Sequence, residues 1–277
     1  MNAIDPNFAD RRAGARHICF MNAAFDRIGP DLALRRIAER NRWLPFQFVV
    51  TPNVDHLVRL ATGRAREAVL YAEAWLTVCD SRVLELIAQM SGEHVDVAPG
   101  SDLTRALFET EIDPDEPVAV IGGTEETISR LSARYGLTDV RWHDAPMGLR
   151  DNPAAVAECA EFAARNPARF TFICVGSPQQ EMVARAIKDR GDCTGVGLCV
   201  GASLEFLTGE TARAPQWIQR ARLEWLHRLA SEPRRLWRRY LVDGPKILLI
   251  WRRWRRERAR IEAVRAEAER RLREALA

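Results

Sequence analysis

The sequence of 277 residues lacks any apolar run long enough to cross a membrane. A transmembrane helix needs about 18 or more apolar residues in succession, and the longest candidate in the C-terminal part extends only from Ile247 to Trp251. Residues 1–16 contain acidic side chains and no apolar segment, so they lack the pattern of a secretory signal. We therefore expect no membrane-spanning protein and treat residues 1–16 as a polar leader that need not be ordered.

Metal and disulfide motifs are also missing. The six cysteines include no CxxC pair and several lie inside apolar runs, which indicates reduced, buried residues of a cytosolic protein. The five histidines show no ligand spacing, and the one DxD string, Asp113 to Asp115, precedes a predicted strand, which is typical of a solvated loop. We predict no metal site. If the chain acts on a substrate with a phosphate leaving group, Arg, Lys or helix N-termini would have to offset the charge of that group.

Charge is unevenly distributed, although the net charge is only +3. Residues 211–277 carry 19 Lys and Arg against 8 Asp and Glu, so the chain totals of 41 and 38 leave 22 basic against 30 acidic residues in 1–210. The same C-terminal segment holds five of the eight tryptophans, and Pro233 and Pro245 interrupt its helical pattern. We expect a mildly acidic body, residues 17–210, and a basic, Trp-rich helical appendage, residues 211–277.

Within the body, short apolar segments alternate with helical patterns. The predicted strands are 17–21, 46–51, 75–79, 117–121, 140–143, 170–175 and 194–200. The predicted helices are 30–42, 54–71, 83–90, 103–109, 125–135, 153–165 and 178–189. This alternation is typical of βαβ units and predicts an α/β fold, a Rossmann-like three-layer core with a mostly parallel sheet. Ligands of such sheets collect at the carboxyl ends of strands.

Polar residues and glycines follow four of the predicted strands. They are Thr51 and Asn53, Asp80 with Arg82, Gly122 with Gly123, and Gly176 with Gln180 and Glu181. Since the carboxyl ends of parallel strands share one edge of a sheet, we expect these residues to converge there.

Asp80 has two interpretations. A carboxylate at a strand end could act as a general base on an incoming hydroxyl, provided that burial brings its pKa toward the working pH. Its position alone favours the other interpretation, in which it caps the helix that follows. Thr51 and Asn53 likewise could bind a sugar or phosphate, or be ordinary helix caps.

The two glycine-containing turns are also open to two interpretations. Gly122 and Gly123 could present backbone amides to a phosphate, or could allow close packing. The turn lacks the GxGxxG spacing and is followed by Glu125 and Glu126, which disfavours a dinucleotide site. The segment 176–181 is either a helix cap or a loop that reads a ligand.

The appendage has three interpretations. Its charge suits nucleic acid. Trp interleaved with Arg on short amphipathic helices equally suits an anionic membrane surface, where indole rings settle among the headgroups. Trp251, Trp254 and Ile261 also fall near heptad spacing, as in an oligomer-forming helix, although Arg258 and Arg265 interrupt the pattern.

Taken in order, these strings resemble the WecG/TagA/CpsF family of bacterial glycosyltransferases from about His17 to Trp251. The most specific part is the appendage, where RAPQWIQRARLEWLHRLASEPRRLWRRYL is similar to the family's RAPxWxxxxxLEWLxRLxxEPxRLWRRYL. TPNVDH, the strand-end Asp80, PGSDL, IGG and GSPQQE match in the same order.

The resemblance implies an inverting, metal-independent enzyme of cell-surface polysaccharide synthesis. It would move N-acetylmannosamine, N-acetylmannosaminuronate, glucose or another hexose from a UDP-sugar to a saccharide carried on polyprenyl diphosphate. The enzyme would be cytoplasmic and peripherally bound to anionic lipids at the inner face of the membrane. No cofactor besides the UDP-sugar substrate and no nucleic acid are expected, and a homo-oligomer stays open.

The resemblance also implies roles for individual residues. Asp80 would be the base, with Thr51 and Asn53 lining the same pocket, and Gln180 and Glu181 would lie around the donor. The appendage would meet diphosphate or headgroup charge with four arginines, namely Arg234, Arg235, Arg238 and Arg239.

The sequence departs from the family pattern at four places. Asp80-Ser81-Arg82-Val83 stands for D-G-x-G, Gln179 for the Lys of P-K-Q-E, Val97 for the Arg of R-V-P-G-x-D, and Glu205 for the Asp of G-G-A-F-D-F. Because a Lys and an Arg are lost and Arg82 is gained, we expect a rearranged anion site. Arg82, Glu205 and the glycines at 122, 123 and 176 therefore join the substrate-binding candidates.

Two other functions compete with this one. The chain could be a non-catalytic module whose basic tail binds nucleic acid or a partner, or a catalytically drifted member that still binds a UDP-sugar.

Overall fold

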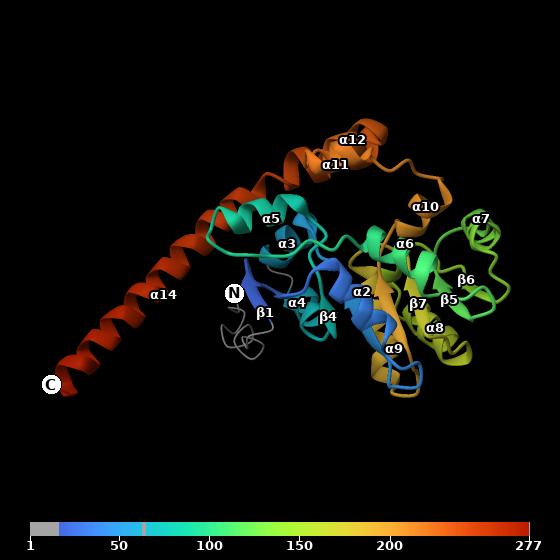
Figure 1. Cartoon of the computed structure of the whole chain (residues 1–277), viewed down its shortest axis with the longest axis horizontal. Coiled ribbons are helices and arrows are strands. Elements are labelled where there is room, and N and C mark those ends of the chain that lie inside the picture. The colour runs from blue at the N-terminus through green and yellow to red at the C-terminus, as the bar shows by residue number, and fades with distance from the viewer. Residues whose placement is uncertain (1–16, 63–64, 277) are drawn as a thin grey trace.

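The computed structural model describes residues 17–62 and 65–276 and has a six-stranded parallel sheet at its centre (Figure 1). The strands are β3 (Gln47–Val50), β4 (Leu76–Thr77), β5 (Val118–Ile121), β6 (Val140–His143), β7 (Phe170–Ile173) and β8 (Val196–Cys199), in the order β4-β3-β8-β7-β5-β6. The predicted α/β core with a mostly parallel sheet is confirmed. The predicted leader, residues 1–16, lies outside the described residues.

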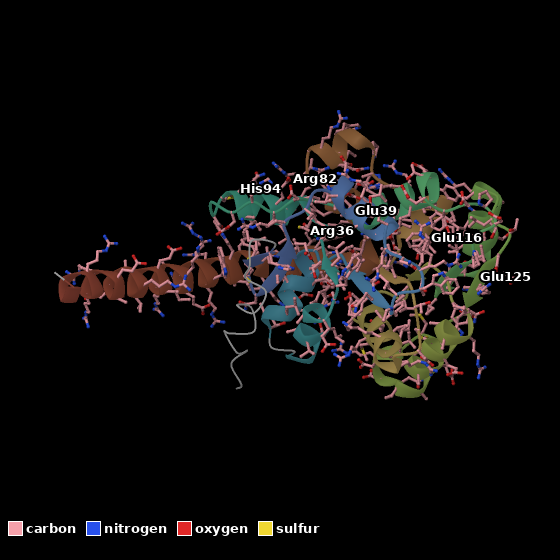
Figure 2. The ribbon with its side chains drawn as sticks, turned by 60° about the horizontal axis from the view of Figure 1, so that its bottom comes forward. Arg36, Glu39, Arg82, His94, Glu116 and Glu125 are labelled. Atoms are coloured by element: carbon pink, nitrogen blue, oxygen red, sulfur yellow. The ribbon has the colours of Figure 1, made fainter. Side chains whose placement is uncertain are left out.

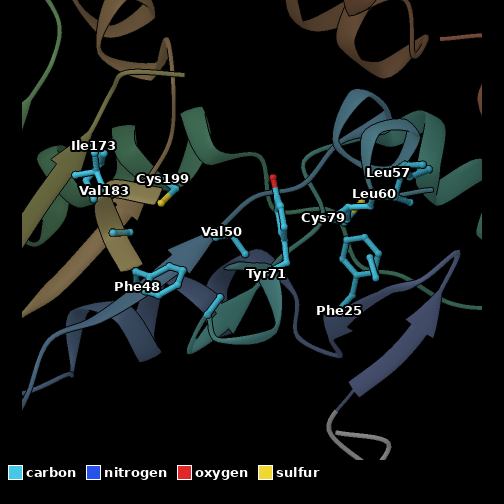
Figure 3. Packing of buried hydrophobic residues seen from close by; sticks show 14 of the residues in the cluster. Phe25, Phe48, Val50, Leu57, Leu60, Tyr71, Cys79, Ile173, Val183 and Cys199 are labelled. Carbon is cyan, nitrogen blue, oxygen red and sulfur yellow. The ribbon is translucent and has the colours of Figure 1, made fainter. Parts of the chain in front are cut away.

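The central strands are buried on both faces. Every residue of β5, β7 and β8 is buried, and successive side chains enter two separate apolar clusters, so that Phe172 lies in one cluster and Ile173 in the other. Figure 3 shows part of the cluster that contains Ile173. A parallel sheet with helices on both faces requires continuous apolar strands, which explains the unbroken apolar runs in the sequence.

Helices form the two outer layers. Those of the body are α2 (Pro30–Ala38), α3 (Val54–Ala61), α4 (Ala65–Ala72), α5 (Arg82–Gln89), α6 (Gly100–Thr110), α7 (Glu125–Tyr135), α8 (Pro153–Arg165), α9 (Gln179–Arg190) and α10 (Ser203–Thr208), with a 3₁₀ turn η1 (Leu149–Asp151). α3, α4, α5, α8 and α9 bury side chains in one cluster, and α2, α6, α7 and α10 in the other. The single helix predicted over 54–71 is wrong, because α3 and α4 are separate elements.

The first predicted strand does not join the parallel sheet. β1 (His17–Phe20) pairs antiparallel with β2 (Ala23–Asp26), which the sequence analysis missed. Only Met21 and Asn22 lie between them, both with positive φ (48° and 69°), as a two-residue hairpin turn requires. A parallel crossover needs about a dozen residues, so two strands joined by two residues can pair only in antiparallel fashion.

The appendage is a series of helices that returns across the body and then leaves it. It comprises α11 (Gln216–Arg220), α12 (Glu224–Ser231), α13 (Pro233–Trp237), a π-helical turn η2 (Arg238–Asp243) and α14 (Lys246–Leu276). Figure 1 shows α14 as an arm that extends well past the body. Its first part is anchored, since Ile247 is 4% exposed and Trp254 packs edge-to-face on Phe20. No helix among the residues described combines the length and the apolar character needed to cross a bilayer.

The turn after β5 allows a test of why glycine is needed there. Gly122 has φ +89°, and an added Cβ would lie 2.7 Å from Val175 Cγ1 and 3.1 Å from the backbone of Cys174. We expect Gly122→Ala to lower the free energy of unfolding by about 3 kcal/mol, from strain and overpacking together. Gly136→Ala is the matched control because Gly136 has φ +66° with nothing within 4 Å, so only strain of about 1 kcal/mol applies. Equal losses in urea denaturation would contradict the packing argument.

Candidate active site

Asp80 follows β4 at the carboxyl edge of the sheet, and its carboxylate is held by two other segments. Its Oδ1 accepts a hydrogen bond from the Gly100 amide, the first of α6, at 2.9 Å. Its Oδ2 lies 3.5 Å from Asn53 Nδ2. The helix after Asp80 is capped instead by Ser81, whose hydroxyl accepts from the Leu84 amide. The interpretation of Asp80 as the cap of its following helix is therefore wrong.

The surroundings of Asp80 shift its titration toward neutrality. Burial raises the pKa of this carboxyl from 3.8 to about 6, while the hydrogen bonds from Gly100 and Asn53 oppose that rise. Two appendage residues of α12 also act on this pKa, Glu224 raising it and Arg228 lowering it. Asp80 is thus ionised at pH 7 and basic enough to accept a proton.

Asn53 is a helix cap, as one of its two interpretations predicted, and its side chain also contacts Asp80. It caps α3, since its Oδ1 accepts from the Asp55 amide at 3.1 Å and its own amide donates to His56 Nδ1 at 2.9 Å. Its Nδ2 is directed to Asp80. Thr51 is 9% exposed and donates a hydrogen bond to the Cys199 carbonyl at 3.3 Å, which joins the ends of β3 and β8. Its side chain also lies beside Gly100, the residue whose amide bonds to Asp80.

Of the four predicted appendage arginines, one reaches this site. Arg239 lies 3.4 Å from Asn53 Oδ1 and 3.8 Å from Asp55 Oδ2. Arg235 pairs with Glu232 in the appendage, and its charge acts on Glu205. Arg234 and Arg238 are exposed. The site therefore includes both the body and the appendage.

The predicted donor-side residues of α9 are buried. Gln180 is 4% and Glu181 1% exposed. Gln180 Oε1 accepts from the Gly201 amide at 2.9 Å, and its Nε2 donates to Glu181 Oε1 at 3.0 Å. α9 begins with no side-chain cap, so the polar side chains after Gly176 do not serve to cap it.

The remaining candidates make no hydrogen bond or ion pair with Asp80 among the residues described. Gly122 and Gly123 follow β5, and the Gly122 amide already donates to the His143 carbonyl, so it is not available to a phosphate. Glu205 accepts from Thr211 at 3.3 Å, and burial raises its pKa. Arg82 is exposed at the first turn of α5 (Figure 2), and no hydrogen bond or ion pair joins it to Asp80 among the residues described.

Several site residues escaped the sequence analysis. Gly100 carries no functional side chain, and Glu224, Arg228 and Arg213 reach the site only because the appendage folds back. Arg213 pairs with Asp102 on α6 at 2.5 Å, which brings the strings RAPQW and PGSDL together. The signal that the sequence offers for this contact is that Arg213 and Asp102 both belong to strings that match the family pattern.

His56 was dismissed as a metal ligand and instead supports α3. Burial, with the charges of Arg59 and Arg239, keeps its pKa well below 6.5, so the ring is neutral and its Nδ1 is free to accept from Asn53. The described part of the chain contains no group of three or more His, Cys, Asp or Glu placed to hold a metal ion.

A model of the glycosyl transferase WecG/TagA/CpsF family matches residues 18–261. The chain belongs to this family. Membership implies glycosyltransferase activity in cell-surface polysaccharide synthesis. The match includes the body and the appendage as far as the projecting part of α14, so the contact between Arg239 and Asn53 lies within the family unit.

The raised pKa of Asp80 predicts how a neutral substitute changes stability with pH. A carboxyl that binds its proton more tightly when folded destabilises the fold as pH rises from its unfolded pKa, near 3.8, to its folded pKa, near 6. The stability of Asp80→Asn relative to wild type should therefore rise by about 2 kcal/mol between pH 4 and pH 7. Urea denaturation at both pH values measures this difference.

Asp139→Asn is the control. Arg141 holds the pKa of Asp139 below its usual value of 3.8, so the stability that this carboxylate contributes is already present above that pH and is lost only as pH falls below it. We therefore expect the difference in stability between Asp139→Asn and wild type to be nearly the same at pH 4 and pH 7. The same pH trend in both variants would contradict the assignment for Asp80.

Proposed function

We propose that this family member is an inverting, metal-independent hexosyltransferase. It moves a sugar such as N-acetylmannosamine, N-acetylmannosaminuronate or glucose from UDP to a saccharide linked to polyprenyl diphosphate. The observation that supports this most is the Asp80 carboxylate, which is held at the carboxyl edge with a pKa of about 6. The charges of Glu224 and Arg228 in the appendage act on this pKa.

In this mechanism Asp80 removes the proton of the acceptor hydroxyl as its oxygen attacks the anomeric carbon. The bond from that carbon to the UDP oxygen breaks on the opposite side, so the configuration inverts and UDP leaves with the electron pair. Asp80 holds the proton afterwards and releases it to solvent. Asn53 and the Gly100 amide keep the carboxylate in place but leave it a weaker acid than a free Asp, as a general base requires.

Arginines of the appendage are the candidates to offset the charge of the diphosphate. The chain has Gln179 and Val97 where the family strings carry Lys and Arg. The appendage brings two cations to the same region. Arg239 contacts Asn53, and the charge of Arg228 lowers the pKa of Asp80. Preorganised guanidinium groups stabilise a leaving diphosphate without reorganisation during the reaction.

Asp80→Asn tests the assigned base. We expect kcat for sugar transfer to fall by about 10²- to 10⁴-fold, the usual contribution of a general base. Binding of the UDP-sugar, measured by calorimetry, should change little, because the Asn side chain still accepts from Gly100. For wild type, kcat/KM should fall tenfold per pH unit below about pH 6. Full activity of the variant would overturn the assignment of Asp80 as the base, whereas absence of turnover in wild type would favour a non-catalytic module.

We also propose that the appendage docks on anionic lipid at the inner face of the cytoplasmic membrane, where the lipid-linked acceptor resides. Large apolar side chains of the appendage are exposed beside its arginines. They are Trp217 (68%), Trp237 (52%), Leu241 (56%), Leu248 (51%) and Leu249 (66%). Exposed Trp and Leu next to Arg is the pattern of a helix that lies in the headgroup region.

Charge on α14 is concentrated near the body, which allows a matched test. Residues 246–260 hold seven Lys and Arg against one Glu, whereas residues 261–276 hold four of each sign. Replacing Arg252, Arg253 and Arg256 with Gln should weaken binding to vesicles containing anionic lipid by on the order of 100-fold, at about 1 kcal/mol per residue.

The control replaces Arg265, Arg270 and Arg271 with Gln. This variant has the same change of net charge, but two of its arginines pair with Glu267 in the projecting part of α14. We expect its vesicle binding, measured by co-sedimentation, to remain within about threefold of wild type. Equal losses in both variants would indicate that net charge, and not this part of α14, governs docking.

A further inference from the structure

A chain of buried and half-buried polar side chains connects α3, α4 and α9 beneath the carboxyl edge. Arg59 of α3 donates to the Ser177 carbonyl at 3.0 Å and to its hydroxyl at 2.6 Å. The Ser177 hydroxyl lies 3.1 Å from the Tyr71 hydroxyl, which in turn donates to Glu181 Oε1 at 3.1 Å. Figure 3 shows the Tyr71 ring within the apolar cluster, with its hydroxyl at the upper end of the side chain.

The donors and acceptors along this chain have one consistent arrangement. Tyr71 has a single proton, and it points to the Glu181 carboxylate. The Ser177 hydroxyl must then donate to the Tyr71 oxygen while it accepts from Arg59. Every hydrogen bond therefore runs in one direction, from the guanidinium to the carboxylate.

The Glu181 carboxylate at the end of this chain and the Gly201 amide fix the orientation of the Gln180 side chain. Its NH₂ group faces Glu181 and its carbonyl oxygen faces the Gly201 amide. A flipped amide would place oxygen against the carboxylate and NH₂ against an N–H, so the flip is excluded. Since Gln180 follows β7 and Gly201 follows β8, the network holds the two loops together at the edge where the donor is proposed to bind.

Arg59 also ties these loops to the base. It lies on α3, whose cap Asn53 contacts Asp80, and it pairs with Asp55 at 3.3 Å and Glu67 at 3.4 Å. Its guanidinium contacts Ser177, which is two residues before Gln179. Gln179 is the position at which the family string has Lys. Neither Arg59 nor Tyr71 belongs to the strings that carry the family resemblance.

We propose that Arg59 and Tyr71 are positioning residues for the sugar-nucleotide donor. They act through Ser177 and Glu181 to fix Gln180 and the loops after β7 and β8, and they do not touch the donor themselves. This inference rests on the proposed function, because it assigns these loops to the donor.

Tyr71→Phe tests the proposal, because it removes one hydroxyl and keeps the ring in the cluster. In the protein without ligand, we expect amide hydrogen exchange to become at least fivefold faster in peptides covering residues 174–182 and 199–205. We expect KM for the UDP-sugar to rise about tenfold while kcat stays within twofold. Tyr135→Phe is the control, since its ring stacks on Phe108 away from this network, and it should change neither quantity.

Ser177→Ala is the second variant, should Tyr71→Phe fail to fold. It removes the middle hydroxyl from a partly exposed loop residue and should give the same exchange and the same rise in KM. Unchanged exchange in these peptides would overturn the network. Changed exchange with unchanged KM would overturn its positioning role.

The failure of the proposed function has a different signature. If wild type neither binds nor turns over UDP-sugars, yet Tyr71→Phe accelerates exchange in both peptides and Tyr135→Phe does not, the network stands and the assignment of the edge to a donor fails.

Discussion

The structure depends on one carboxylate, Asp80, being placed where two helices begin. One of its oxygens meets the first amide of α6, and the other meets the cap of α3. For this to happen α6 must start close to the ends of β3 and β4. The chain achieves this by pairing Val97 with Cys79 as an extra bridge of the sheet, and by having glycine at position 100, where a Cβ would lie 3.0 Å from Thr51 Oγ1. Partial burial then makes the carboxylate a stronger base than an exposed Asp.

The charge asymmetry of the sequence is partly used within the molecule. The acidic body and basic appendage suggest an external anionic partner, yet several arginines of the appendage pair with carboxylates of the body. Arg213 pairs with Asp102, Arg222 with Glu85 and Arg239 with Asp55, so these contacts join the appendage to α6, α5 and α3. These pairs close the appendage over the candidate site and leave the exposed arginines of α14 for other contacts.

Local sequence patterns predicted those features of the fold that depend on residues close together in the chain. Strand ends and helix starts depend on periodicity and capping residues, so the parallel sheet and the placement of Asp80, Thr51 and Asn53 at one edge were predictable. The partners of Asp80 were not, because Gly100 is 20 residues away and contributes a backbone amide that any residue except proline has. The burial of Glu181 was also hidden, since its partner Tyr71 lies 110 residues earlier in the chain. The β1–β2 hairpin was missed because four-residue strands with a two-residue turn give too short an alternating pattern.

The anchoring of α14 has a mechanical consequence. Trp251 bonds to Ser91 at 2.7 Å, Trp254 packs on Phe20 and Arg258 pairs with Glu93, so three successive turns of this helix are fastened to the body. A helix fastened at three points cannot swivel independently of the body to which it is attached. Any flat surface that its basic half contacts therefore sets the tilt of the whole molecule. In the proposed function it would also set the height and direction from which a lipid-linked acceptor approaches Asp80.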